Sequence, residues 1–222
     1  PGGAEDIRQV LKVNETEDTE AGAYQFVTVG IRHATLSHLV YAWLTPFTDI
    51  RSAKETTGGS TDAEFMRINQ FYMQTSQNMA KYQGLKTAGK DIELKYLGVY
   101  VLTVTDNSTF KGILNIADTV TAVNDKTFDS SKDLIDYVNS QKLGDPVKVT
   151  YEEDGKVKSA EGKIITLENG KNGIGIGLID RTEVTSDVPI RFSTAGIGGP
   201  SAGLMFSLAI YTQIADPGLR NG

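Results

Sequence analysis

The sequence predicts an α+β fold, because strand patterns and helix patterns follow one another along its 222 residues. Three observations carry this prediction. Residues 23–31 are rich in β-branched and aromatic residues, and Thr61 and Glu64 form a Thr-x-x-Glu capping pair ahead of a helical run. Residues 146–165 read as two alternating strands joined by Asp-Gly, a strong hairpin signal. Both kinds of element are therefore expected around a real hydrophobic core.

The N-terminal part of the chain mixes the two patterns. The strand expected at 23–31 is followed by apolar residues at helical spacing over 34–44 and by a polar, glycine-containing loop at 54–62. The capping pair then predicts a long helix over about 61–84. Residues 86–90 read as a linker, so this part is expected to end near residue 90.

A second unit is expected from residue 91 to residue 178. Strands are predicted at 97–106 and 119–128, and an amphipathic helix at 130–141. The Asp-Gly hairpin at 146–165 completes the unit. We find no internal repeat.

Composition excludes several classes of function. The net charge is -6 and the basic residues are scattered, which argues against a nucleic-acid partner. The absence of cysteine excludes disulfides and thiolate metal sites, and His33 and His38 are five apart, off the spacing of a helical metal pair. "GIGIGL" (173–178) lacks the spacing of a dinucleotide loop and reads as a closely packed strand. We therefore expect no metal and no cofactor.

The stretch "GIGGPSAGLMFSLAIY" (196–211) places Ser201 between a glycine-rich turn and an apolar helix, directly after a strand expected at 188–194. Gly199 to Gly203 match G-x-S-x-G, but Pro200 restricts the backbone and no histidine follows, which excludes an α/β-hydrolase elbow. Two alternatives remain. Ser201 is the N-cap of the helix, or it is a nucleophile whose oxyanion is held at the helix start.

The second alternative gains from a resemblance. "GGPSAG" followed by "LMFSLAIY" resembles the catalytic-serine motif of the Lon proteases, and "DVPIRFSTAG" resembles the strand that leads into it. "MQTSQNMA" (73–80) is similar to an earlier helix of that family. The resemblance implies Ser201 as the nucleophile, with Gly198, Gly199 and Ala202 at the oxyanion or the substrate backbone.

Residues 91–178 resemble a PDZ domain. "YLGV" stands where that family has its carboxylate-binding loop, and "LNIADTVTAVND" (114–125) follows its strand pattern. The resemblance implies a peptide added as a strand beside Tyr100–Thr103. The expected peptide-binding residues are Leu97, Gly98, Val99, Tyr100, Val101, Leu134 and Val138, although Leu134 and Val138 could equally be ordinary core residues.

Together these features resemble the membrane-anchored, ATP-independent PDZ–Lon serine proteases of Gram-positive bacteria, which include processors of secreted signalling peptides. We therefore expect a Lon-type domain, formed by 1–90 and 179–222, with an inserted PDZ domain at 91–178. "PGGAEDI" resembles the segment after the membrane anchor, which implies a site on the extracytoplasmic face of the cell membrane. The expected partner is a peptide or protein substrate, and the family implies a homo-oligomer.

The resemblance also implies a Ser–Lys dyad, whose lysine must be neutral to act as a base. The last lysine is Lys171, so the catalytic lysine is expected beyond Gly222 and these residues alone are expected to be inactive or nearly so. The alternative function is a non-catalytic adaptor in which the PDZ domain binds peptides and Ser201 only caps a helix.

Overall fold

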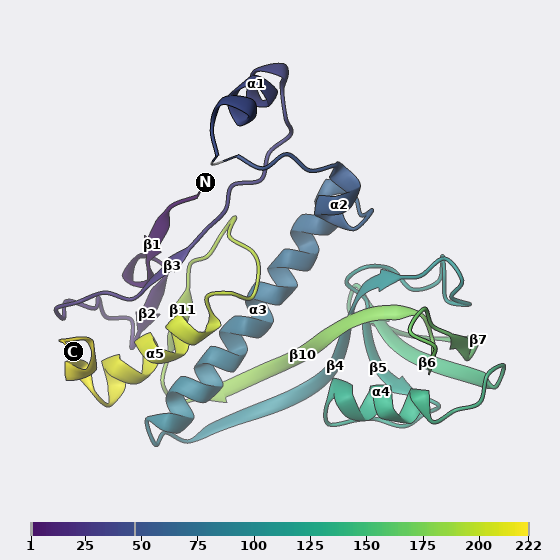
Figure 1. The fold of residues 1–222 in the computed structure, drawn as a ribbon. Helices are drawn as coiled ribbons and strands as arrows, with labels where there is room; N and C mark the ends of the chain where they lie inside the picture. The colour runs from purple at the N-terminus through teal and green to yellow at the C-terminus, as the bar shows by residue number, and fades with distance from the viewer. Residues whose placement is uncertain (1, 47, 222) are drawn as a thin grey trace. The chain divides into compact units, whose positions relative to one another are not determined.

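The computed structural model describes residues 2–46 and 48–221, and the chain divides into two compact units (Figure 1). The first contains the residues up to Asp91 together with those from Asp187 onward, and the second contains Ile92–Ser186. The chain therefore leaves the first unit once and returns to it. The boundary expected after residue 178 falls inside strand β10, so the second unit is longer than the sequence predicts.

The strands of the first unit are short and form two antiparallel pairs, β1 with β3 and β2 with β11. The β2–β11 pair joins the N-terminal region to the segment that follows the second unit. Only three residues of the predicted strand at 23–31 pair, and only three of that at 188–194. The bounds are β1 Ala4–Asp6, the 3-10 helix η1 Ile7–Gln9, β2 Leu11–Val13, β3 Gln25–Val27 and β11 Ile190–Phe192.

The capping pair predicted before the long helix is confirmed. Thr61 accepts a hydrogen bond from the Glu64 N–H, and the Glu64 carboxylate accepts one from the Thr61 N–H. A second capping box at Ser52 and Glu55 opens a short helix where a loop was expected. The helices of this unit are α1 Leu36–Leu44, α2 Ala53–Thr57, α3 Asp62–Thr87 and α5 Gly203–Ile214, followed by the 3-10 helix η2 Pro217–Asn221.

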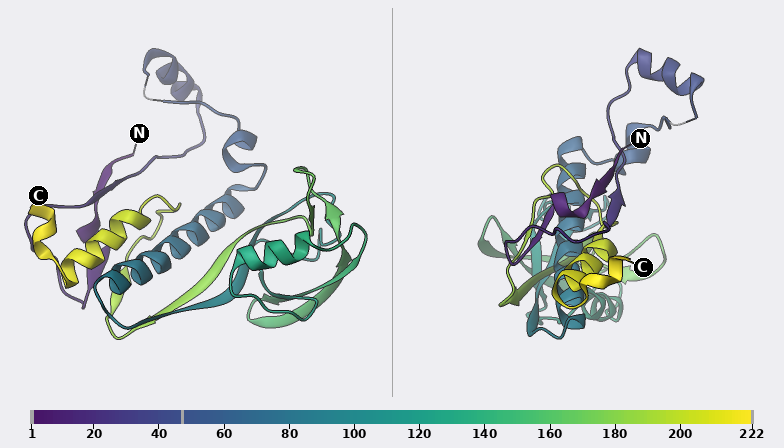
Figure 2. Two further views of the ribbon diagram at one scale, coloured as in Figure 1. Left: turned by 60° about the horizontal axis from the view of Figure 1, so that its bottom comes forward. Right: turned by 90° about the vertical axis from the view of Figure 1, so that its left-hand side faces the viewer.

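The core of the first unit forms where α5 lies along α3 (Figures 1 and 2). Gly84 permits this approach, because a Cβ atom there would lie 2.9 Å from the Ile210 side chain. Phe206 of α5 is fully buried, with its ring centroid 4.9 Å from that of Phe192 and 5.8 Å from that of Phe26. This aromatic cluster ties α5 to strands from both ends of the chain.

The second unit is built on a five-stranded antiparallel sheet with the order β10-β4-β5-β6-β7, and β8 pairs separately with β9. The predicted Asp-Gly hairpin is confirmed: Glu153 pairs with Lys156, and Asp154 and Gly155 both have positive φ, as a two-residue hairpin turn requires. The elements are β4 Ile92–Val104, β5 Thr119–Val123, α4 Ser131–Asn139, β6 Pro146–Glu153, β7 Lys156–Lys163, β8 Ile165–Thr166, β9 Asn172–Gly173 and β10 Ile176–Ser186.

Helix α4 packs its apolar face on this core, with Leu134 and Val138 only 2% and 4% exposed. The core is otherwise made of inward-facing strand and loop residues. Its buried members include Val99, Val101, Phe110, Leu114, Val120, Val123, Val147, Val149, Tyr151, Ile164 and Ile174.

Candidate functional site

Ser201 lies in the turn that leads into α5 and is exposed. The N-cap of α5 is Ala202, which makes no side-chain capping hydrogen bond to the start of the helix. Among the residues that the structure describes, the Ser201 hydroxyl has no hydrogen-bond partner. The interpretation of Ser201 as a helix cap is therefore wrong, because the cap position falls one residue later, on a residue without a hydroxyl group.

The loop before Ser201 is fixed to α3 by two hydrogen bonds. Ser76 Oγ donates to the Pro200 carbonyl at 3.0 Å, and the Gly199 N–H donates to the Asn69 carbonyl at 2.9 Å. The approach is so close that a Cβ atom on Gly198 would lie 2.6 Å from Asn69 Cβ. The loop that carries Ser201 is thus held by a regular helix, which favours a defined position for its hydroxyl.

This contact involves a segment that the sequence singles out. Ser76 and Gln77 belong to "MQTSQNMA", and Gln77 Nε2 donates to Thr194 Oγ1 at 2.7 Å, on the strand side of the same loop. Two neighbouring positions of α3 therefore hold the loop at two points. The sequence indicated a related helix but gave no sign of which side chains would make the contact.

The three residues expected at the oxyanion or the substrate backbone differ in exposure and in whether their backbone N–H groups already donate a hydrogen bond. The Gly199 N–H is already donated to Asn69, so the expectation that it offers a free donor is wrong in this arrangement. Ala202 is fully buried at the start of α5, whereas Gly198 is exposed beside the serine loop. Gly199 therefore fixes the loop, and an oxyanion role for Gly198 or Ala202 stays a prediction.

Lys81 lies one turn beyond Gln77 on α3 and faces β11. Its Nζ lies 5.5 Å from the centroid of the Phe192 ring, and burial lowers the pKa of the Lys81 amine below its usual value. Phe192 in turn packs against Phe206 of α5. Lys81 thus supports the aromatic cluster, and in the described part of the chain its recorded contact is with Phe192 and not with Ser201. The lysine expected beyond Gly222 lies outside these residues.

The stretch expected to receive a peptide has no free edge. Val99 and Tyr100 pair with β10 on one side and with β5 on the other, and the Val101 N–H donates to the Asp118 carbonyl. Val99 and Val101 are fully buried in the core. The expectation that Tyr100–Thr103 offers a receiving edge is therefore wrong, because β4 is an interior strand of the sheet.

Leu97 and Gly98 also belong to this interior strand. Leu97 lies at a register shift between two pairs of the β4–β10 ladder, and Gly98 pairs with Arg181. A Cβ atom on Gly98 would lie 2.3 Å from the Val120 carbonyl oxygen, so the close contact serves the sheet. Leu134 and Val138 are likewise core residues in this structure, with their side chains almost fully buried.

Among the strands that the structure describes, the edge strand next to α4 is β10, since β10 stands at one end of the strand order. Asp180 of β10 accepts a hydrogen bond from the Ser131 N–H at the start of α4, at 3.1 Å. Ile135 follows Ser131 at i+4 and therefore shares its side of the helix, and it is 39% exposed. An apolar side chain thus lies beside the edge strand of the sheet.

The chain enters this edge strand through a closely packed glycine-rich turn. The Gly175 carbonyl accepts from the Thr105 N–H at 2.8 Å, and the Ile174 carbonyl accepts from Ser108 Oγ at 2.6 Å. Gly175 has φ of 74°, and a Cβ atom there would lie 2.5 Å from Thr105 Oγ1. The close packing predicted for "GIGIGL" is confirmed, but its place beside α4 was not foreseen.

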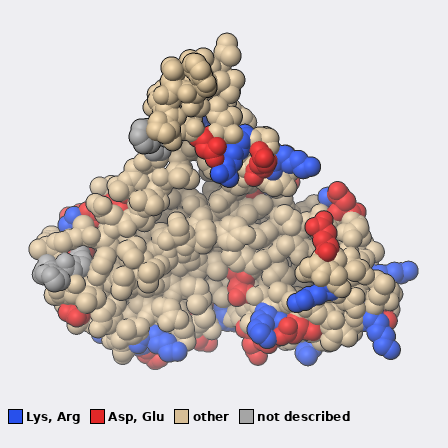
Figure 3. All heavy atoms as spheres, viewed as in Figure 1, with Lys and Arg blue, Asp and Glu red and all other residues tan. Residues whose placement is uncertain are grey.

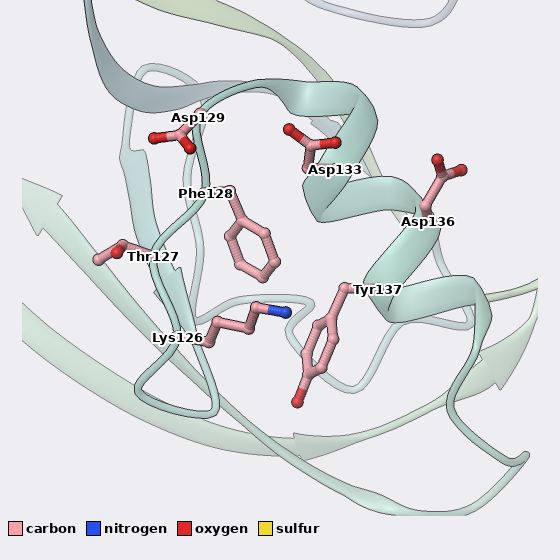
Figure 4. Close-up of a pocket in the computed structure, with 7 residues that line it drawn as sticks. All are labelled: Lys126, Thr127, Phe128, Asp129, Asp133, Asp136 and Tyr137. Atoms are coloured by element: carbon pink, nitrogen blue, oxygen red, sulfur yellow. The ribbon is translucent and has the colours of Figure 1, made fainter.

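Figure 4 shows an open pocket of about 400 Å³ on the other flank of α4. The Lys126 amine lies 4.9 Å from the centroid of the Tyr137 ring and 5.6 Å from that of Phe128. Such cation–π contacts fasten the segment after β5 to the helix. The pocket is lined by Lys126, Thr127, Phe128, Asp129, Asp133, Asp136 and Tyr137.

One hydroxyl group near the junction of β10 and α4 stands out. Tyr96 Oη is buried without a hydrogen-bond partner among the described residues. Burial raises the pKa of the Tyr96 phenol, and the charges of Asp180 and Asp133 raise it further. Tyr96 therefore stays neutral and presents a hydroxyl group to this region.

Comparison with protein families decides the identity of the second unit. The family model described as "PDZ domain" matches residues 69–164, which include β4, β5, α4, β6 and β7. The chain contains a PDZ domain. The match identifies this domain, and it covers less than half of the chain.

Two of the solved structures similar to this chain are titled as PDZ domains. The PDZ domain of an SdrC-like protein from Listeria monocytogenes is 36% identical, with 39% of this chain and 93% of that one covered and a TM-score of 0.37. That of an SdrC-like protein from Listeria innocua is 39% identical, with 36% and 92% covered and a TM-score of 0.35. No curated protein matches the chain.

The remaining sequence expectations concern histidine and the membrane. His33 Nε2 lies 2.7 Å from Asp62 Oδ2, and His38 Nδ1 completes the capping box at Thr35, so both histidines have local roles beside the helices. Over the described ranges, none of the helices is both long and apolar enough to cross a bilayer.

Proposed function

We propose that the chain binds peptides through its PDZ domain, and that the peptide pairs with the free edge of β10 beside α4. PDZ domains bind extended peptides by adding them as a strand to a sheet edge. The single observation that supports the location is that β10 ends the sheet on the side where α4 packs. Backbone pairing there supplies affinity that is independent of the peptide sequence.

We propose that selectivity for the peptide comes from apolar side chains beside β10 and from the turn that precedes it. Ile135, and the partly buried Ile176 and Leu178 of β10, offer apolar surface for a peptide side chain. The turn at 173–175 precedes the edge strand, and backbone N–H groups in such glycine-rich turns form concavities that capture a terminal carboxylate. We therefore expect a preference for peptides with an apolar C-terminal residue and a free carboxylate.

This proposal is tested by fluorescence polarisation with labelled peptides that end in an apolar residue. Amidation of the C-terminus and the substitution Ile135→Lys are each expected to weaken binding at least tenfold. The matched control is Val157→Lys, which changes an apolar residue that is 75% exposed on β7, the opposite edge of the sheet. Equal affinity of the Ile135→Lys variant and the control would overturn the location.

We further propose that the first unit is the catalytic part of an ATP-independent serine endopeptidase, with Ser201 as nucleophile. The support is the exposed hydroxyl of Ser201, which has no hydrogen-bond partner in the described ranges, on a loop that α3 holds in place. A lysine C-terminal to Gly222 is proposed as the base, on the resemblance to Lon proteases alone. Membrane anchoring, an extracytoplasmic site and processing of a secreted signalling peptide belong to the same proposal.

Cleavage of a fluorogenic peptide library by the full-length protein tests this second proposal. Ser201→Ala is expected to abolish turnover, while Ser193→Ala, an exposed serine in the same segment, leaves it unchanged. Retained turnover in the Ser201→Ala protein would refute the nucleophile. Peptide binding without any cleavage by the unsubstituted protein would favour the adaptor function.

A further inference from the structure

The hydroxyl group of Ser76 on α3 donates its hydrogen bond away from its own helix. A serine inside a helix often donates to the carbonyl four residues earlier, as Ser207 of α5 does to the Gly203 carbonyl at 3.0 Å. Ser76 Oγ instead donates to the Pro200 carbonyl at 3.0 Å, far along the chain. The Ser76 side chain is therefore committed to the loop that carries Ser201.

The contacts of Ser76 fall on both sides of Ser201. Pro200 precedes Ser201, and a Cβ atom on Gly203, two residues after Ser201, would lie 2.5 Å from Ser76 Oγ. Because Gly203 has no side chain, the start of α5 can lie directly against Ser76. The Pro200 carbonyl also accepts from the Gly203 N–H at 3.4 Å. The two ends of the short turn around the proposed nucleophile are thus both held at Ser76.

Ser76 fixes more than the path of this loop, because a peptide group is planar. The carbonyl of Pro200 and the N–H of Ser201 belong to the same trans peptide group and point in opposite directions. A Pro200 carbonyl that is held towards Ser76 therefore turns the Ser201 N–H away from α3. Over the residues that the structure describes, this N–H donates to no acceptor, whereas the Gly199 N–H donates to Asn69.

The segment around this N–H carries no charged side chain. Residues 192–215 contain no Lys, Arg, Asp or Glu, and in Figure 3 the surface over the loop and the start of α5 is tan. In the proposed reaction the bond from Ser201 Oγ to the substrate carbonyl carbon forms, the π electron pair moves to the carbonyl oxygen, and the hydroxyl proton passes to the base. Within this segment, only uncharged hydrogen-bond donors can stabilise the negative oxygen.

We propose that Ser76 is a positioning residue for Ser201: by holding the Pro200 carbonyl, it aims the Ser201 N–H at the oxygen on which negative charge develops. The inference rests on the proposed peptidase function. In other serine proteases the N–H of the nucleophilic serine is one of the oxyanion donors. The Ser201 N–H would thus act beside the donors expected at Gly198 and Ala202, and Ser76 would act through it without touching the substrate.

Steady-state kinetics of the full-length protein, with a fluorogenic peptide that it cleaves, test this role. Ser76→Ala removes only the hydroxyl group and keeps the helix, because alanine has the highest helix propensity. Since a misplacement of about 1 Å can cost roughly a hundredfold in rate, we expect kcat to fall at least about tenfold, with KM within about twofold of its original value. The matched control is Thr87→Ala, which removes an exposed hydroxyl group at the end of the same helix and leaves both constants unchanged.

A peptide aldehyde of the same sequence gives a second readout, which a general loss of stability would not produce. Addition of Ser201 Oγ to the aldehyde carbon places an oxygen where the oxyanion of the reaction develops, as the hydroxyl proton passes to the base. The matching peptide alcohol has no carbonyl group and binds without this oxygen. Ser76→Ala is expected to raise the Ki of the aldehyde by the same factor by which it lowers kcat/KM, and to leave the Ki of the alcohol unchanged.

Two results would overturn the proposal. One is a Ser76→Ala protein whose kcat equals that of the unsubstituted protein. The other is a fall in kcat together with an equal weakening of the peptide alcohol or a lower midpoint of urea unfolding, since it would assign Ser76 to the stability of the loop. Failure of the proposed peptidase function looks different, because the unsubstituted full-length protein then cleaves no peptide. In that case Ser76 has no reaction to serve, and this inference fails with it.

Discussion

At the scale of single residues, Asp118 is the buried carboxyl group with the most direct consequence for stability. It is 4% exposed, and the Asn115 N–H donates to its Oδ2 at 2.8 Å. Burial raises the pKa of Asp118 above its ordinary value of 3.8, although the hydrogen bond from Asn115 works in the other direction. The ionised form of Asp118 therefore lowers the free energy of unfolding, because its charge is removed from water.

The sign of the pH dependence follows from this shift. Because the folded protein binds the Asp118 proton more tightly than the unfolded chain does, stability falls as the pH rises from the ordinary value through the raised pKa. Asp118→Asn keeps the acceptor for Asn115 and removes the charge. We expect this variant to unfold at higher denaturant concentration than the wild type near neutral pH, with the difference vanishing below the ordinary value.

Urea unfolding curves at neutral and acidic pH measure this difference. Asp129→Asn, at an exposed position, reports the general effect of removing one negative charge. An Asp118→Asn protein that is less stable than the wild type near neutral pH would contradict the expectation.

At the scale of elements, the two long helices of the first unit begin in different ways. Thr61 and Glu64 cap α3 reciprocally, whereas α5 starts at Ala202 without a side-chain cap. Thr61→Ala should cost about 1 kcal/mol of unfolding free energy, as is typical for loss of an N-cap. Ser201→Ala should change it by less than about 0.5 kcal/mol, as exposed substitutions do.

Thermal and denaturant unfolding of the two variants provide the comparison. A loss for Ser201→Ala as large as that for Thr61→Ala would restore the capping role of Ser201. This measurement needs no substrate. It therefore shows whether the Ser201 hydroxyl stabilises the fold, even if the peptidase assay detects no cleavage.

Local sequence signals predicted the elements well where the signal lies within a few residues. The Thr61–Glu64 capping box and the Asp154-Gly155 hairpin both formed as expected. The function of Ser201 within its turn was not predictable, because a shift of the cap by one residue decides it. The lengths of β3 and β11, three residues each, were overestimated, because residues with high strand propensity extend beyond those that pair.

At the scale of the whole molecule, the sequence could not show which strand ends the sheet. Tyr100–Thr103 was expected to receive the peptide, but β10 pairs with this strand from far along the chain and takes the edge position. An interior strand has a second pairing strand that can come from a distant part of the sequence, and a local sequence pattern carries no information about that partner. The same limit hid the exposure of Ile135, whose apolar character alone suggests a core residue.

The register of the β4–β10 ladder also explains how one unit can sit inside the sequence of another. Ile92, where the second unit begins, pairs directly with Ser186, where it ends. The first and last residues of the second unit are therefore neighbours in space. The first unit has only to accommodate two chain ends that are as far apart as two paired strands. A module with adjoining ends of this kind can be gained, lost or exchanged in evolution without stretching the protein that carries it.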